Sequence, residues 1–98
     1  MLLTSQNLSE MKLKTKQFTL QTAEAEINVR LLTSAEIEDL KLVRDIIMAA
    51  VVDNNGKPVF ENAEAFDSLA LAVQKEIMDN VWDYNCLKRE SIEEIKKN

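Results

Sequence analysis

The chain contains one glycine and one proline, Gly56 and Pro58, close together near the middle of 98 residues. These two residue types turn and interrupt chains most strongly, so this sequence lacks the repeated turn signals of a β-sandwich or barrel. Elsewhere the chain is rich in Ala, Leu, Glu and Lys, which favour helix. We therefore expect helix to dominate, with one strong turn at Gly56.

Two segments before the helical part alternate in the manner of strands. In residues 14–20, Phe18 and Leu20 share one face. In residues 24–31 the apolar positions Ala25, Ile27, Val29 and Leu31 alternate with polar ones. The short link at residues 21–23 predicts an antiparallel β-hairpin over residues 14–32. For residues 1–13 we keep two alternatives, a short helical turn from Ser9 or a mobile segment.

The helical part begins at a capping box, in which the Thr33 hydroxyl and the Glu36 carboxylate each accept from the other residue's amide. Apolar residues then recur at helical spacing to Val52, where the Asp53–Gly56 turn ends the helix. Pro58 favours extended structure at the residue before it. A second helix is expected from about Ser68 to Tyr84, with Asn62 or Asp67 as its cap, and a short last helix from Ser91.

These elements together predict an α+β fold that is mainly helical. The N-terminal β-hairpin of residues 14–32 packs on a small bundle of two main helices plus short helices, which occupies residues 33–98. A chain of 98 residues has surface enough for one core, so we expect a single domain over residues 1–98.

The charge pattern restricts the class of partner. Seventeen acidic and twelve basic residues give a net charge of −5, and the basic residues form no stripe, which disfavours nucleic acid. The longest apolar run, Ile46–Val52, is far too short to span a bilayer, and the first residues lack a basic leader. Cys86 is the one cysteine, which fits a cytoplasmic protein.

The residue types needed for most catalytic and metal sites are missing. Without histidine the chain builds no Ser-His-Asp triad and no ordinary zinc site, and one glycine excludes phosphate-binding loops. With Gly56 as the sixth position of a calcium loop, the first would be Val51 and the twelfth Asn62, which do not supply the required carboxylates. We expect no enzyme activity, no cofactor and no metal, and interpret the turn as structural.

The order of the motifs resembles the tail assembly chaperones of long-tailed phages and prophages. The segment Val51–Phe60, with its Val-Asp-Asn-Asn-Gly-Lys-Pro-Val-Phe turn, carries most of the likeness. Four further segments also fit the family pattern. They are Leu3-Thr4 near the start, Lys14–Lys16 before the first strand, Val29–Thr33 at the end of the second strand, and Tyr84–Leu87. Many relatives have Asn-Gly-Leu where this chain has Asn-Cys-Leu, so the backbone at Cys86 departs from the pattern. The turn motif consists of Asp53, Gly56, Lys57, Pro58 and Phe60.

The resemblance implies a short-form chaperone that coats the phage tape-measure protein, keeps it soluble and hands it to tail-tube subunits. It implies further partners in the tail-tube protein and in a frameshifted longer form of the chain. The protein would then work in the host cytoplasm, be absent from the mature virion and act through apolar surface. The candidate contact residues are Met48, Val52, Phe60, Phe66, Met78 and Trp82. The same side chains are also needed to form the hydrophobic core. Two alternative functions remain: a structural subunit of the tail or virion, or a small regulatory binding protein. Self-association is also possible.

Overall fold

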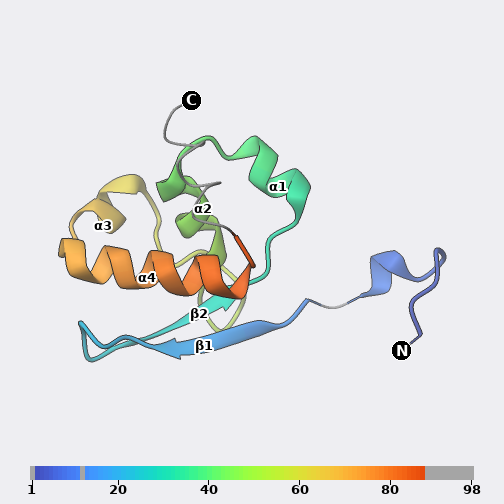
Figure 1. The fold of residues 1–98 in the computed structure, drawn as a ribbon, viewed down its shortest axis with the longest axis horizontal. Coiled ribbons are helices and arrows are strands. Elements are labelled where there is room, and N and C mark those ends of the chain that lie inside the picture. Colours follow the sequence, from blue (N-terminus) through green and yellow to red (C-terminus); the bar gives the residue numbers. More distant parts are fainter. Residues whose placement is uncertain (1, 12, 88–98) are drawn as a thin grey trace.

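The computed structural model describes residues 2–11 and 13–87 and has the α+β architecture predicted from the sequence (Figure 1). An antiparallel sheet formed early in the chain packs against helices that follow it. None of the helices in the described ranges is long and apolar enough to cross a lipid bilayer. The elements follow in the order η1 (Leu8–Glu10), β1 (Thr15–Thr19), β2 (Glu26–Arg30), α1 (Ser34–Asp39), α2 (Val43–Ala50), β3 (Val51–Val52), α3 (Ala63–Asp67) and α4 (Leu71–Tyr84).

The predicted hairpin is formed by β1 and β2, which pair antiparallel with Phe18 opposite Ile27. A third strand was not expected. Val51 and Val52 continue directly from α2 as β3 and pair antiparallel with β2, where Val51 lies opposite Val29. The prediction that the helix extends to Val52 is therefore wrong, because two buried β-branched residues satisfy their backbone groups better in the sheet.

The predicted helix from residue 33 is divided into two. The capping box is present as expected: the Glu36 amide donates to the Thr33 hydroxyl and the Thr33 amide donates to the Glu36 carboxylate, both at 3.1 Å. Leu40 then adopts an extended conformation, and a new helix starts after Leu42. α1 is exposed or half-buried throughout, whereas α2 buries Ile46, Ile47 and Ala50. Because the helix is interrupted, α2 takes its own direction and packs these side chains into the core.

The turn after β3 is organised by the Asp53 carboxylate, which accepts from the amides of Asn55 at 2.8 Å and Lys57 at 3.0 Å. Gly56 has a φ of 81°, the left-handed conformation that glycine adopts without strain. Pro58 forms a bridge with Val52, so the chain returns beside β3 after the turn. The turn motif from Asp53 to Phe60 thus forms one compact corner, in which Lys57 and Pro58 are exposed.

α3 and α4 correspond to the second predicted helix and the segment before it. Asn62, one of the two expected caps, accepts from the Ala65 amide and starts α3, and the long helix begins at Leu71 and not at Ser68. α4 lies along the sheet formed by β1 and β2 (Figure 1). Between them is the core, whose most buried members come from β2, α2, β3 and α4: Val29, Ile46, Ile47, Val51, Val52, Ile77 and Val81.

The long helix is tied to the hairpin through Glu76, in its first half, and through Tyr84, whose hydroxyl donates to the carbonyl of Lys14 at 3.1 Å. Glu76 accepts hydrogen bonds from the amides of Gln21 and Thr22, at 2.6 and 2.9 Å, and so holds the β1–β2 loop. After α4, Cys86 is exposed and has a φ of 57°, which is left-handed. The short helix expected from Ser91 lies outside the described residues.

Residues 2–11 and 13, which we name the N-terminal arm, extend away from the rest of the molecule (Figure 1). The arm contains the 3-10 helix η1 where the sequence allowed a helical turn from Ser9. Its large apolar residues are exposed rather than packed, among them Leu2 at 85 % and Leu8 at 54 % of the residue's full accessible surface. The arm therefore adds apolar surface outside the core.

Candidate docking groove

The structure distributes the six predicted contact residues over three environments. Val52 and Trp82 are buried in the interior, with 2 % and 4 % exposure. Met48 and Phe60 are half-buried against the core, and Phe60 meets the ring of Phe66 edge to face with centroids 5.4 Å apart. Phe66 and Met78 line a groove. The structure thus brings only these two of the six together at one concave surface.

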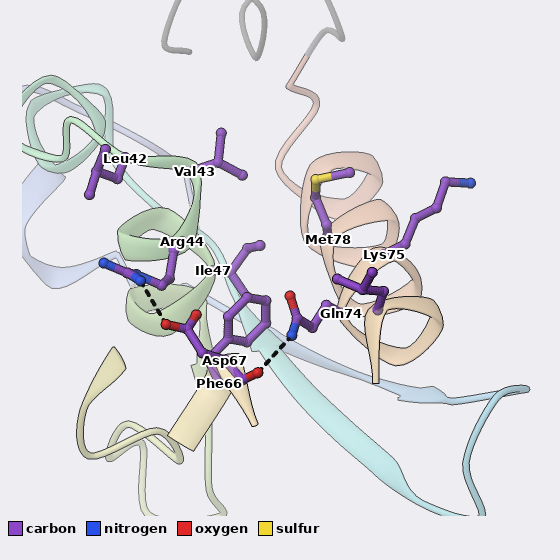
Figure 2. A pocket seen from close by; sticks show the side chains of 10 residues that line it. Leu42, Val43, Arg44, Ile47, Phe66, Asp67, Gln74, Lys75 and Met78 are labelled. Atoms are coloured by element: carbon purple, nitrogen blue, oxygen red, sulfur yellow. Dashed lines mark hydrogen bonds and ion pairs between the residues drawn. The ribbon is translucent and has the colours of Figure 1, made fainter. Parts of the chain in front are cut away.

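The groove lies between α2, α3 and α4 and encloses about 610 Å³. Figure 2 shows its side chains converging from the three elements. The start of α2 supplies one wall, Ile47 of α2 and Phe66 of α3 form the base, and one face of α4 supplies the opposite wall. Its lining consists of Leu42, Val43, Arg44, Ile47, Phe66, Asp67, Leu71, Gln74, Lys75 and Met78. A groove of this volume lies near the middle of the range of sites that bind a ligand or a few partner side chains.

The apolar lining changes from buried to exposed between the base and the rim. Ile47 and Phe66 are nearly fully buried, at 2 % and 5 % exposure, and belong to the core cluster. Leu42 and Leu71, on opposite walls, are 51 % and 82 % exposed. A rim of two exposed leucines above an apolar base is unfavourable in water and is typical of a surface that a partner covers.

Polar groups hold the walls in place. Arg44 on α2 donates to the Asp67 carboxylate on α3 at 2.9 Å. The side-chain amide of Gln74 on α4 donates to the carbonyl of Asp67 at 3.3 Å (Figure 2). It also donates to the carbonyl of Leu69 at 2.8 Å. These bonds connect α3 to both neighbouring helices, so the groove is a feature of a fixed three-helix corner. The Lys75 side chain is largely exposed, and its ammonium points away from the groove (Figure 2).

Two carboxylates with shifted pKa values lie away from the groove. Arg30 donates two hydrogen bonds to the Glu36 carboxylate, from Nη1 at 3.2 Å and from Nη2 at 2.5 Å, and this hydrogen bonding is the main reason why the pKa of Glu36 is lowered to about 2. The hydrogen bond from the Gln21 amide is the main cause of the lowered pKa of Glu76. Both carboxylates are engaged in fastening one element to another, which indicates structural work.

Most of the groove was not identified from the sequence, which missed Leu42, Val43, Arg44, Ile47, Asp67, Leu71, Gln74 and Lys75. One signal was available: Leu71 and Met78 lie seven positions apart, two helical turns, outside the main apolar stripe of their helix. Within the described ranges, no three His, Cys, Asp or Glu side chains gather where they could hold a metal ion. The chain matches no model of a known protein family, no curated protein and no solved structure.

Proposed function

We propose that this chain is a phage tail assembly chaperone, which binds apolar helical segments of the tape-measure protein in the groove between α2, α3 and α4. It keeps that protein soluble in the host cytoplasm, supports tail-tube assembly and is absent from the finished virion. The chain acts by binding, without turnover. The observation that carries the proposal is the groove itself, with exposed Leu42 and Leu71 above a base of Ile47 and Phe66.

The shape of the groove suits a helix that presents an apolar stripe. Helix-in-groove recognition uses anchors spaced three and four residues apart, which enter a hydrophobic groove between the partner's helices. Here the two walls are themselves helices, and their connection through Asp67 keeps the groove open at a fixed width. Covering a leucine as exposed as Leu71 contributes about 1.5–3 kcal/mol. A few such contacts give binding that the tail-tube subunits can still displace.

The charge of the chain supports the same role. A net charge of −5 keeps a complex with an aggregation-prone apolar partner in solution through mutual repulsion between complexes. The resemblance of the Val51–Phe60 segment to the tail assembly chaperones supplies the identity of the partner. In this structure that segment forms β3 and the corner after it, where Phe60 packs on Phe66 at the base of the groove.

Co-expression with the tape-measure protein of the same phage or prophage tests the proposal. We expect the wild-type chain to make the tape-measure protein soluble and to co-purify with it. Leu71→Asp places a charge on the groove rim at an exposed position and should abolish both effects. Val59→Asp is the matched control, because Val59 is also an exposed apolar residue, at 51 %, but lies outside the groove. Insoluble tape-measure protein without co-purification in the wild-type experiment would contradict the proposal.

Mass spectrometry of purified particles tests the remaining part of the proposal. A chaperone is released before the tail is complete, so peptides of this chain should be missing from mature virions while tail-tube peptides are abundant. Stoichiometric amounts in the virion would instead identify a structural subunit. A longer frameshifted form of the chain would be visible in infected cells as a second, larger product that shares its peptides.

A further inference from the structure

Exposed apolar side chains are concentrated in two places on this molecule. Within residues 2–11 and 13–87 the structure shows eight large apolar residues that are exposed: Leu2, Leu3, Leu8, Met11, Leu13, Leu42, Val59 and Leu71. The first five belong to the N-terminal arm, and Leu42 and Leu71 form the rim of the groove. Only Val59 belongs to neither. Each surface is unfavourable in water alone, and covering one with the other removes both from water.

The arm has a local structure suited to insertion. The Asn7 side-chain amide donates to the carbonyl of Leu2 at 2.8 Å, and its oxygen accepts from the Thr4 amide at 2.7 Å. The 3-10 turn Leu8–Glu10 follows. These bonds fold the arm back on itself between Leu2 and Asn7. The arm therefore presents a compact apolar segment and not a fully extended chain. A preorganised segment loses less conformational entropy when it binds.

The direction of the arm favours a second molecule as its partner. In Figure 1 the arm runs from β1 away from the body, whereas α3 and the start of α4, which carry the Phe66 and Leu71 side of the groove, lie at the opposite end of the molecule. The arm therefore points away from its own groove. The groove of another copy is open to it.

We propose that the N-terminal arm of one copy occupies the groove of a second copy, with Leu2, Leu3 and Leu8 covering the space between Leu42 and Leu71. The inference rests on the proposed function in one respect, since a groove suited to a partner's apolar helix needs cover while that partner is absent. Arm and groove are different surfaces, so two copies exchange arms reciprocally or successive copies form a chain.

Sedimentation velocity and light scattering of the full chain over a concentration series test the inference under reducing conditions. Wild type should self-associate as concentration rises. Leu3→Asp with Leu8→Asp in the arm, and Leu71→Asp in the groove, should each weaken self-association by roughly tenfold or more, the factor expected for losing one buried leucine. Val59→Asp, the matched exposed control, should leave it unchanged. All four substituted positions are exposed, and circular dichroism verifies the fold of each variant.

Mixing the two defective variants gives the sharper result. The arm variant retains an intact groove and the Leu71→Asp variant retains an intact arm, so together they form a single arm–groove contact. At a concentration at which each variant alone is monomeric, we expect the mixture to form a one-to-one pair that does not grow further. A wild-type monomer at every concentration, unchanged self-association in both variants, or a mixture without pairing would each overturn the inference. The tape-measure protein is absent from these experiments, so such a failure leaves the proposed function standing.

Discussion

The side-chain oxygen of Asn85 accepts a hydrogen bond of 2.7 Å from the backbone amide of Leu32. Its amide group donates to the carbonyls of Arg30 and Val81, at 3.3 and 3.1 Å. A single side chain at the end of α4 thereby fixes the chain as it leaves β2. These backbone groups are partly buried, so the loss of their partner is costly.

Asn85→Ala should lower the free energy of unfolding by about 1–3 kcal/mol, because it leaves the Leu32 amide and the Arg30 carbonyl without their partner. Urea unfolding followed through the fluorescence of buried Trp82 measures the change. Asn80→Ala is the control, since Asn80 is half-buried on the same helix and has no side-chain hydrogen bond within the described part of the chain. Equal effects of the two substitutions would show that the Asn85 bonds do not stabilise the fold.

Glu36→Gln isolates the charge of the capping residue, since glutamine still reaches the Thr33 amide. The pKa of Glu36 is lowered from 4.5 to about 2, chiefly by the hydrogen bond from Arg30, so folding favours the ionised form. Its stabilisation is complete above pH 4.5 and disappears as the pH falls toward 2. At pH 7 we expect a loss of about 0.5–1 kcal/mol, because the side chain is 37 % exposed and solvent screens the pair.

The control for this charge is Glu38→Gln, which removes an exposed carboxylate from the same helix. Unfolding free energies measured from pH 7 to pH 2 should converge for wild type and Glu36→Gln at the acid end. A constant difference over that range would be inconsistent with a charge effect and would indicate altered packing.

Glu76→Ala should release the β1–β2 loop without unfolding the domain. The Glu76 carboxylate accepts from the Gln21 amide, the Thr22 amide and, at 2.7 Å, the Thr22 hydroxyl. Hydrogen exchange monitored by NMR should become faster at the Gln21 and Thr22 amides and stay unchanged at the core strand β2. Glu24→Ala, on the same loop, is the control. Unchanged protection at both loop amides would show that the carboxylate does not hold them in solution.

Gly56→Ala should destabilise the domain by about 1–2 kcal/mol, the penalty of a left-handed backbone in a residue with a Cβ. The cause is conformation and not crowding, because a Cβ added at Gly56 meets no described atom within 4 Å. Gly56→Asn should cost less, since asparagine tolerates this conformation. Thermal unfolding of both variants compares them, and an alanine variant as stable as the asparagine variant would contradict the φ of 81°.

The sequence predicted those elements whose causes lie within a few residues. Thr33 and Glu36 cap their helix through bonds to each other's amides, and the alternation at Ile27 and Val29 specifies a strand with one buried face. Such signals are local, so they are readable without knowledge of the rest of the fold. The overall α+β class followed from them.

The third strand and the helix break depend on distant residues. An apolar run such as Ile46–Val52 fits a buried helix as well as a buried strand, and only pairing with Val29 distinguishes the two at Val51. Leu40 and Leu42 are good helix formers, so nothing local announces the break between them.

The groove was harder still to predict, since its walls come from three elements. The exposure of Leu71 is determined by where α2 and α3 lie, and its place beside the apolar stripe of α4 does not show which side chains it meets. Phe66 and Met78 were named among the candidate contact residues for their apolar side chains, which are a property of the sequence. Their meeting at one surface is a property of the packing.

The left-handed backbone at Cys86 places an exposed thiol directly after α4. In air, thiols so placed on two molecules can join as an intermolecular disulfide, which would mimic a dimer without involving arm or groove. Cys86→Gly removes the thiol and also the steric penalty of a side chain at that φ, so it should give a protein that cannot form the disulfide and is slightly more stable. This substitution is the natural background for every solution measurement on the chain.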